Sequence, residues 1–381
     1  MNNPNSGRRR WLKSLLQQSA ALGAGATGLP ASASARNNPR NTVRFGLIGD
    51  VPYQVGDEDM VRKVMHSARR EAQFLIHVGD FKSGAESCAD QMLTRRLNLL
   101  NESPVPIIVV PGDNEWTDCS RMMTGLFDPL ERLGKLRQLL AGKPNGFGRG
   151  KLTIERPSSN DGQRGFPHPV RQPEYMRWQA GPCLFVSLNI TGSANGLTPH
   201  IGDDFNLERA RHNTHWLMDS ARIARERSLA GLVIIVHADL QFHRSTINDD
   251  TREVLDRANP YGWVRGLLMR VTANFPGTVL LLNGDRHRFI NDYPFTDLAR
   301  IVDLANNRAE QFRWGVTAKV AHPRLARFTR VQSFGWPFTS HHVIIEATRL
   351  NTPPGEDPGL RLLVATRVLP MHGEEPDEPI N

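Results

Sequence analysis

Short runs of aliphatic and β-branched residues alternate along the chain with longer stretches in which apolar residues recur every three or four positions. The short runs predict strands and the longer stretches predict amphipathic helices. Strands that alternate with helices are typical of βα units around a mostly parallel sheet, so we expect the α/β class. The predicted strands are 43–49, 74–78, 105–110, 183–188, 232–236 and 278–282.

The first predicted helix follows Asp57, which can cap it. Its apolar face comprises Val61, Val64, Met65, Ala68 and Ala72. The other helices are predicted at about 89–100, 206–226 and 263–275. Near the end of the chain, 342–345 and 360–366 have the pattern of strands, and we assign them to a second sheet.

A single domain is expected from 36 to 368, since no internal repeat interrupts this order. The segment at about 141–175 is rich in glycine and proline and has little periodicity. It predicts a loop insertion that either shapes a substrate entrance or only covers surface. Residues 369–381 are rich in proline and glutamate and predict a flexible tail.

Polar residues follow the predicted strands in a repeated way. A lone Asp after a strand is more often a turn former or a helix cap. Here four strands end in a Gly-Asp pair, and two histidines lie at similar places. Ligands bind beyond the carboxyl ends of strands in open α/β sheets, and carboxylates gathered there repel one another unless cations neutralise them. The sequence therefore predicts a metal centre formed by Asp50, Asp80, Asp113, His237, Asp285 and His287.

The order Gly-Asp, Gly-Asp, Gly-Asp-Asn-Glu, His and Gly-Asp-Arg-His resembles the motifs of the calcineurin-like metallophosphoesterases, which include purple acid phosphatases. That family has Gly-Asn-His-Glu as its third motif and Gly-His-x-His as its last. The resemblance covers about residues 43–290. It implies a four-layer α/β/β/α sandwich with two central mixed sheets and a centre with two metal ions.

The resemblance assigns Asp50 and His287 to the first metal and Asp80 to a bridge between both ions. The family's first motif is Asp-x-His, whereas Pro52 occupies the place of the histidine here and cannot ligate a metal. Tyr53 is the alternative ligand, because purple acid phosphatases use a tyrosine, although theirs comes from the second motif.

The same resemblance assigns Asp113, His237 and Asp285 to the second metal. Asp113 and Asp285 replace an asparagine and a histidine of the family, and the added carboxylates favour Mn, Mg, Ca or Fe over a nitrogen-rich Zn site. Asn114 replaces the family's catalytic histidine. An amide can orient a phosphate, but it cannot donate a proton as an imidazolium does.

The activity that the resemblance implies is hydrolysis of phosphate mono- or diesters at the two metals, with Asn114 and Arg286 as catalytic residues. Lys82, Arg286 and Arg288 are candidates for phosphate contacts, or are ordinary surface charges. Two alternatives stay open. One is a catalytically silent relative that binds metal or an anion, which the replacements at Pro52 and Asn114 favour. The other is a doubly wound phosphotransferase with one Mg ion and an aspartyl nucleophile.

The N-terminus predicts export. Arg8-Arg9-Arg10-Trp11-Leu12-Lys13 resembles a twin-arginine motif, a weakly apolar stretch follows, and 30–35 offers an A-x-A cleavage site. We expect a signal peptide at 1–35, the twin-arginine export machinery as a partner, no stable membrane anchor, and a periplasmic or secreted protein. The alternative is a disordered basic tail.

Charge and cysteines add two expectations. The net charge is +8, but without the four basic residues of the N-terminal motif 43 basic residues face 39 acidic ones. Such a small surplus predicts a solvated surface, so we expect no nucleic acid as a partner. A phosphorylated substrate is what the resemblance implies. Of three cysteines, Cys88 and Cys119 lie in loops after predicted metal-binding turns and are the expected disulfide, whereas Cys183 is expected to be a buried thiol.

Overall fold

The computed structural model describes residues 41–157, 172–244, 253–295, 299–303, 308–312 and 323–370. These residues all belong to one compact unit, Asn38–Asn381. The predicted signal peptide and residues 371–381 of the predicted tail lie outside the described residues, as does 158–171 of the predicted insertion.

The first sheet has five strands in the order β13-β12-β1-β2-β3. Strands β1, β2 and β3 are parallel, and β12 pairs antiparallel with both β1 and β13. The assignment of the last two strands to a second sheet is therefore wrong: β12 hydrogen-bonds along β1 and continues its apolar inner face with Val343 and Ile345. The strands are β1 Thr42–Ile48, β2 Phe74–His77, β3 Ile107–Val109, β12 His341–Arg349 and β13 Leu360–Val368.

The second sheet has six strands in the order β4-β5-β6-β7-β11-β8. Strands β5, β6, β7 and β11 are parallel, and β4 and β8 are antiparallel edges. Because the strands of the described core form two separate sheets of five and six strands, the alternative of a single doubly wound sheet is wrong. The strands are β4 Arg177–Ala180, β5 Cys183–Ser187, β6 Gly231–Ile235, β7 Thr278–Asn283, β8 Ile290–Asp292 and β11 Phe328–Gln332, with a separate pair of β9 Ala299–Asp303 and β10 Arg308–Phe312.

Alternation along the strands explains the layers. Phe45 on β1 and Phe185 on β5 meet edge to face between the two sheets, with ring centroids 5.1 Å apart. Neighbouring residues point the other way: Leu75 packs with the helices over the first sheet, and Leu184 packs with those over the second. Strands that are apolar on both faces are buried on both faces. The fold is thus the expected α/β sandwich with two central mixed sheets.

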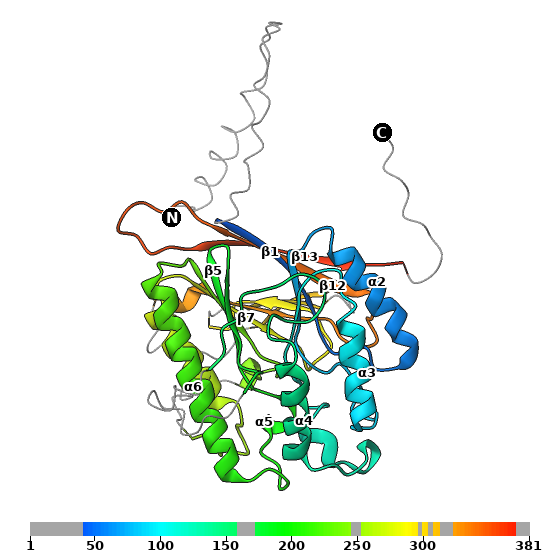
Figure 1. Cartoon of the computed structure of the whole chain (residues 1–381). Coiled ribbons are helices and arrows are strands. Elements are labelled where there is room, and N and C mark those ends of the chain that lie inside the picture. The colour runs from blue at the N-terminus through cyan, green and yellow to red at the C-terminus, as the bar shows by residue number, and fades with distance from the viewer. Residues whose placement is uncertain are drawn as a thin grey trace, which may run out of the picture. The chain divides into compact units, whose positions relative to one another are not determined.

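Helices cover both outer faces. In Figure 1, α2 and α3 lie together on one side of the sheets and α6 on the other; α2 contacts β12, and α6 contacts β5 and β6. The side chain of Asp57 does not cap α2 as predicted but accepts the N–H groups of Tyr53 and Gln54. The helices are α2 Glu58–Ala68, α3 Asp90–Leu100, α4 Pro129–Ala141, α5 Gly192–Asn195, α6 Asp203–Glu226 and α7 Gly262–Asn274, with short 3₁₀ helices η1 Val55–Asp57, η2 Thr117–Ser120, η3 Met122–Thr124, η5 Phe242–Arg244 and η6 Pro323–Arg327.

The cysteine predictions are confirmed. Cys88 and Cys119 form a disulfide, and Cys183 is a buried free thiol on β5. Across the described residues we find no helix with the length and apolar character needed to cross a membrane.

Candidate metal centre

Three aspartates follow the parallel strands of the first sheet. Asp50 and Asp80 come after β1 and β2 and have a left-handed backbone, each with a φ of 55°. Aspartate tolerates this region better than most residues, so the chain can turn sharply where each strand ends. Asp113 follows β3, and the preceding Gly112 has to lack a side chain, because a Cβ there would overlap the Asp80 carboxylate. The three carboxylates therefore lie at one end of the sheet.

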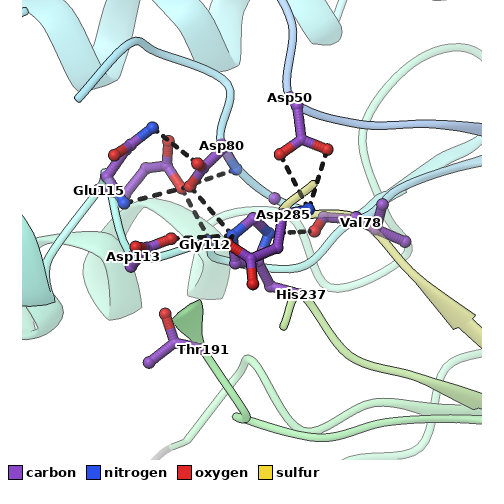
Figure 2. A network of polar contacts seen from close by, with 12 residues as sticks. Asp50, Val78, Asp80, Gly112, Asp113, Glu115, Thr191, His237 and Asp285 are labelled. Atoms are coloured by element: carbon purple, nitrogen blue, oxygen red, sulfur yellow. Dashed lines mark hydrogen bonds and ion pairs between the residues drawn. The ribbon is translucent and has the colours of Figure 1, made fainter. Parts of the chain in front are cut away.

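The second sheet contributes His237 after β6 and Asp285 and His287 after β7. His237 is fully buried, and its Nδ1 lies 2.8 Å from the carbonyl oxygen of Val78. That contact directs Nε2 toward the aspartates, and Figure 2 shows the ring among Asp80, Asp113 and Asp285. One imidazole thus joins the strand ends of the two sheets.

Distances define two overlapping groups of metal-ligating atoms. His237 Nε2 lies 2.8 Å from Asp113 Oδ1, 3.4 Å from Asp80 Oδ1 and 4.0 Å from Asp285 Oδ1. Asp50, Asp80 and His237 each offer an atom within 4.8 Å of the others, and so do Asp113, His237 and Asp285. The structure thus brings together Asp113, His237 and Asp285, the residues predicted to bind the second metal.

The other predicted ligands gather on the far side of Asp80. Tyr53 donates its hydroxyl to Asp80 Oδ2 at 3.1 Å and lies 3.0 Å from His287 Nε2. His287 Nε2 is 3.7 Å from Asp50 Oδ1, and its Nδ1 is held 2.8 Å from the carbonyl oxygen of Trp336. The Tyr53 hydroxyl therefore lies beside two candidate ligands of the first metal, Asp80 and His287. The side chain of Pro52 has no atom that could bind a metal.

Burial dominates the electrostatics of these carboxylates. It raises the pKa of Asp50 to about 8, opposed by His237 and assisted by Asp285. Burial likewise raises the pKa of Asp285 to about 6 and that of Asp80 well above its usual range. A carboxyl group with a raised pKa is one whose negative charge is poorly compensated. The centre is thus short of positive charge.

His237 and Asp113 behave differently because they pair. Burial favours a neutral His237, but Asp80 and Asp113 outweigh it and raise the pKa of the imidazole well above its usual value. Burial also acts to raise the pKa of Asp113, but the contacts with His237 and Ser193 hold that pKa below its usual range. A single imidazole offsets part of the negative charge and leaves the rest.

Asn114 and Glu115 form the turn after β3. Asn114 Nδ2 donates to Asp80 Oδ2 at 2.6 Å and to the carbonyl oxygen of Lys82 at 3.1 Å. Glu115 is buried and accepts the N–H groups of Asp80 and Gly112, so it ties the second turn to the third. No role was predicted for Glu115 from the sequence, although its place beside the third Gly-Asp pair was visible.

The predicted phosphate contacts are in different settings. Lys82 is buried, and its Nζ donates to the carbonyl oxygens of Ser83 and Glu86, so its charge is committed to the loop. The carbonyl oxygen of Arg288 accepts from Gln332 Nε2. Arg286 is 63% exposed, with its Nε 3.8 Å from Asp239 Oδ2. Arg286 therefore presents an exposed guanidinium beside the centre.

Two residues at the centre were missed at the level of sequence. Ser193 Oγ donates to Asp113 Oδ2 at 2.7 Å, and Arg121 Nη2 donates to Ser193 Oγ at 3.2 Å. Ser193 follows β5 after Thr191 and Gly192, a polar strand end like the others, and this was the available signal. No sequence signal pointed to Arg121, because its partner Ser193 lies 72 residues away in the chain.

The donor set fits cations. Four aspartates and His237, the tyrosine hydroxyl and His287 supply mainly oxygen atoms, which suit Mn, Mg, Ca or Fe. The poorly compensated charge of Asp50, Asp80 and Asp285 is what a bound cation would neutralise.

No protein-family model and no curated protein matches the chain. Among solved structures it is similar to GAP50, the anchor in the inner membrane complex of Plasmodium, with 10% identity, a TM-score of 0.41 and coverage of 88% of this chain and 90% of that one. It is similar to the purple acid phosphatase PPD1 from yellow lupin (Lupinus luteus) seeds, with 11% identity, a TM-score of 0.41 and coverage of 81% and 51%. A third is a 5'-nucleotidase precursor from Thermus thermophilus, with 10% identity, a TM-score of 0.41 and coverage of 86% and 54%. The chain spans about half the length of these last two, and the likeness assigns it no activity.

Proposed function

We propose that the chain is a metal-dependent phosphoesterase that hydrolyses phosphate mono- or diesters after export from the cytoplasm. The observation that carries the proposal is the gathering of Asp50, Asp80, Asp113 and Asp285 around one buried imidazole, with more negative charge than that imidazole offsets. Such a cluster is costly unless it holds cations. Export follows from the N-terminal motif alone.

Each ligand has a distinct task in this proposal. Asp80 suits a bridge, since Oδ1 faces His237 and Oδ2 faces Tyr53. Asp50 and His287 belong to the first metal, and Asp113, His237 and Asp285 to the second. Bound metal ions supply a nucleophile at neutral pH and Lewis acidity toward the phosphoryl oxygens.

Asn114 and Arg286 act on the substrate. Asn114 Nδ2, which donates to Asp80 Oδ2 here, would become available to an oxygen of the phosphate when Asp80 binds metal, and Arg286 contributes positive charge from the rim. Because an amide has no proton to transfer, departure of the leaving group depends on that group's own acidity. We therefore expect faster turnover of aryl phosphates than of alkyl phosphates.

Metal analysis followed by turnover tests this proposal. The purified mature protein, incubated with Mn or Fe and desalted, is expected to hold two ions per chain and to hydrolyse p-nitrophenyl phosphate or its bis-ester. His237→Ala removes a ligand and is expected to lose at least one ion, whereas the matched variant His215→Ala, on α6 and outside both ligand groups, keeps both.

One outcome would favour the catalytically silent relative instead. Full metal occupancy without turnover of any mono- or diester would mean that the changes at Pro52 and Asn114 have removed catalysis. Failure to bind metal at all contradicts the phosphoesterase and leaves the silent relative only as an anion-binding protein.

A further inference from the structure

A guanidinium group reaches the candidate metal centre from a loop that the metal ligands do not use. Arg121 lies between η2 and η3, and its side chain is 53% exposed. Its Nη2 is 2.7 Å from Asp118 Oδ2 and donates to Ser193 Oγ, which in turn donates to Asp113 Oδ2. Two hydrogen bonds thus connect Arg121 to a ligand of the second metal.

The second terminal nitrogen of Arg121 lies beside Gly84. A Cβ at Gly84 would lie 2.8 Å from Asn114 Oδ1 and 3.6 Å from Arg121 Nη1, so the backbone passes close to both groups and only glycine fits there without a shift. One glycine therefore adjoins both Arg121 and Asn114, whose Nδ2 donates to Asp80 Oδ2.

The loop that carries Arg121 is held in place. The Cys88–Cys119 disulfide closes it two residues earlier, and Thr124 Oγ1 donates to the carbonyl oxygens of Asp118 and Arg121. A guanidinium presented from a fixed loop loses less entropy when it binds a ligand.

The segment that contains Ser193 is also held in place. Ser193, Ala194 and Asn195 have φ values of 48°, 54° and 54°, a left-handed run that costs energy for residues with a Cβ. Buried Arg209 donates to Asn195 Oδ1 at 2.9 Å, and Asn195 N donates to the hydroxyl of Tyr261, so the run is fixed by its surroundings. Strain of this kind persists where neighbouring structure enforces it and is concentrated at functional sites.

We propose that Arg121 binds a phosphate oxygen of the substrate, with Ser193 as the residue that positions it. Arginine matches two phosphate oxygens at once, and its charge compensates for the imidazolium that Asn114 lacks. The inference rests on the proposed function, because it assumes that a phosphate reaches the metals.

Calorimetric titration of the Mn-loaded protein with inorganic phosphate tests the inference without turnover. Arg121→Gln is expected to weaken phosphate binding about tenfold to a hundredfold, in line with loss of a charge-assisted contact, at unchanged Mn content. Arg121→Lys keeps the charge and is expected to fall between Arg121→Gln and the unchanged protein. Ser193→Ala frees the guanidinium and also removes the hydrogen bond to Asp113, so its Mn content is measured first; at equal Mn content it is expected to weaken phosphate binding less than Arg121→Gln.

Arg222→Gln is the matched control. Its side chain is 43% exposed, and its partners Asp219 and Glu226 lie on its own helix, α6. It loses the same charge, so phosphate affinity is expected to change less than twofold. An equal loss in Arg222→Gln and Arg121→Gln would show a general charge effect and overturn the inference.

The outcomes separate this inference from the proposed function. Normal phosphate affinity in Mn-loaded Arg121→Gln overturns the role of Arg121 and leaves hydrolysis standing. Weakened affinity in a protein that hydrolyses no ester upholds the phosphate contact and contradicts the hydrolase. If the unchanged Mn-loaded protein binds no phosphate, both are overturned.

Discussion

Two clusters of charged side chains among the described residues differ in how their charge is balanced. One is the candidate metal centre at the strand ends. The other is a cavity of about 410 Å³ next to α6 and the end of α7, lined in part by Glu155, Arg177, Trp216, Asp219 and Arg222. In the cavity Arg177 bonds to both Glu155 and Asp219, and its guanidinium lies 4.3 Å from the Trp216 ring centre. The carboxylates of the cavity are therefore paired with guanidinium groups.

At the candidate metal centre the carboxylates lie close to one another. Asp50 is fully buried, and both of its oxygens accept the backbone N–H of Asp285. Its raised pKa contrasts with that of Asp219 in the cavity, where burial acts to raise the pKa but Arg222 and Arg177 hold it below its usual range. The cavity is complete as a structural ion-pair network, whereas the centre has buried carboxylates whose charge its own cationic side chains do not offset. Charge balance distinguishes a stabilising cluster from a candidate site.

Loss of the bridging carboxylate is expected to have the largest effect. Asp80→Asn removes the carboxylate that faces both halves of the centre, so metal stoichiometry should fall and activity should drop more than about a hundredfold, since even changing a residue that only hydrogen-bonds a metal ligand costs about 10- to 100-fold. Elemental analysis and aryl phosphate turnover measure this. Asp219→Asn in the cavity is the control and should keep both metals; if the two variants lose metal equally, the contrast between the regions fails.

Loss of a guanidinium group in the cavity should lower stability rather than metal content. Arg177→Met leaves Glu155 and Asp219 without their shared partner and removes the contact with Trp216. Both acids keep some solvent exposure, so we expect a loss of about 1–3 kcal/mol in the free energy of unfolding. Urea denaturation measures it. Metal content should be unchanged, and a loss of bound metal would mean that the two regions are coupled.

The pH dependence of the metal-free protein follows from the carboxyl groups. The pKa of Asp50 is about 8 when folded, so its contribution to stability is full below its unfolded pKa near 4 and is lost as the pH rises toward 8. Asp285 and His237 also have raised pKa values and act in the same direction. The melting temperature of the metal-free protein should therefore fall from pH 5 to pH 8. Added Mn should reduce that slope, and an equal slope with and without Mn would argue against ligation by these groups.

The sequence predicted what is encoded locally. Gly-Asp pairs after apolar runs placed Asp50, Asp80 and Asp113 at strand ends, because the turn and the carboxylate are neighbours in the chain. The sequence-based prediction assigned β12 to the wrong sheet. β12 pairs with β1, for example Leu47 with Val343, and no local sequence pattern near either residue indicates which strand will be its neighbour. Contacts of this kind depend on which sheet edge is left open.

The same limit applies to the candidate site. Arg121 and Ser193 are 72 residues apart, and Ser193 and Asp113 are 80 apart. No motif spans such intervals, so the contacts emerge only when the two sheets pack together. The polar strand ends and the resemblance to a family supplied the candidate ligands, but neither pointed to Arg121 or Ser193.

The smallest expected effect comes from adding a cation to the carboxylate-rich centre. Asn114→His restores the acid of the family whose motifs this sequence resembles; Gly84 packs closely against Asn114 Oδ1, so the larger ring requires a small shift of that loop. Proton donation should help poor leaving groups, so we expect alkyl phosphate turnover to rise about threefold to tenfold and aryl phosphate turnover to stay nearly constant. The ratio of the two rates measures this, with Asn274→His at the cavity as the control. If both substrates gain equally, the histidine acts through charge alone, and the leaving group does not depend on the missing acid.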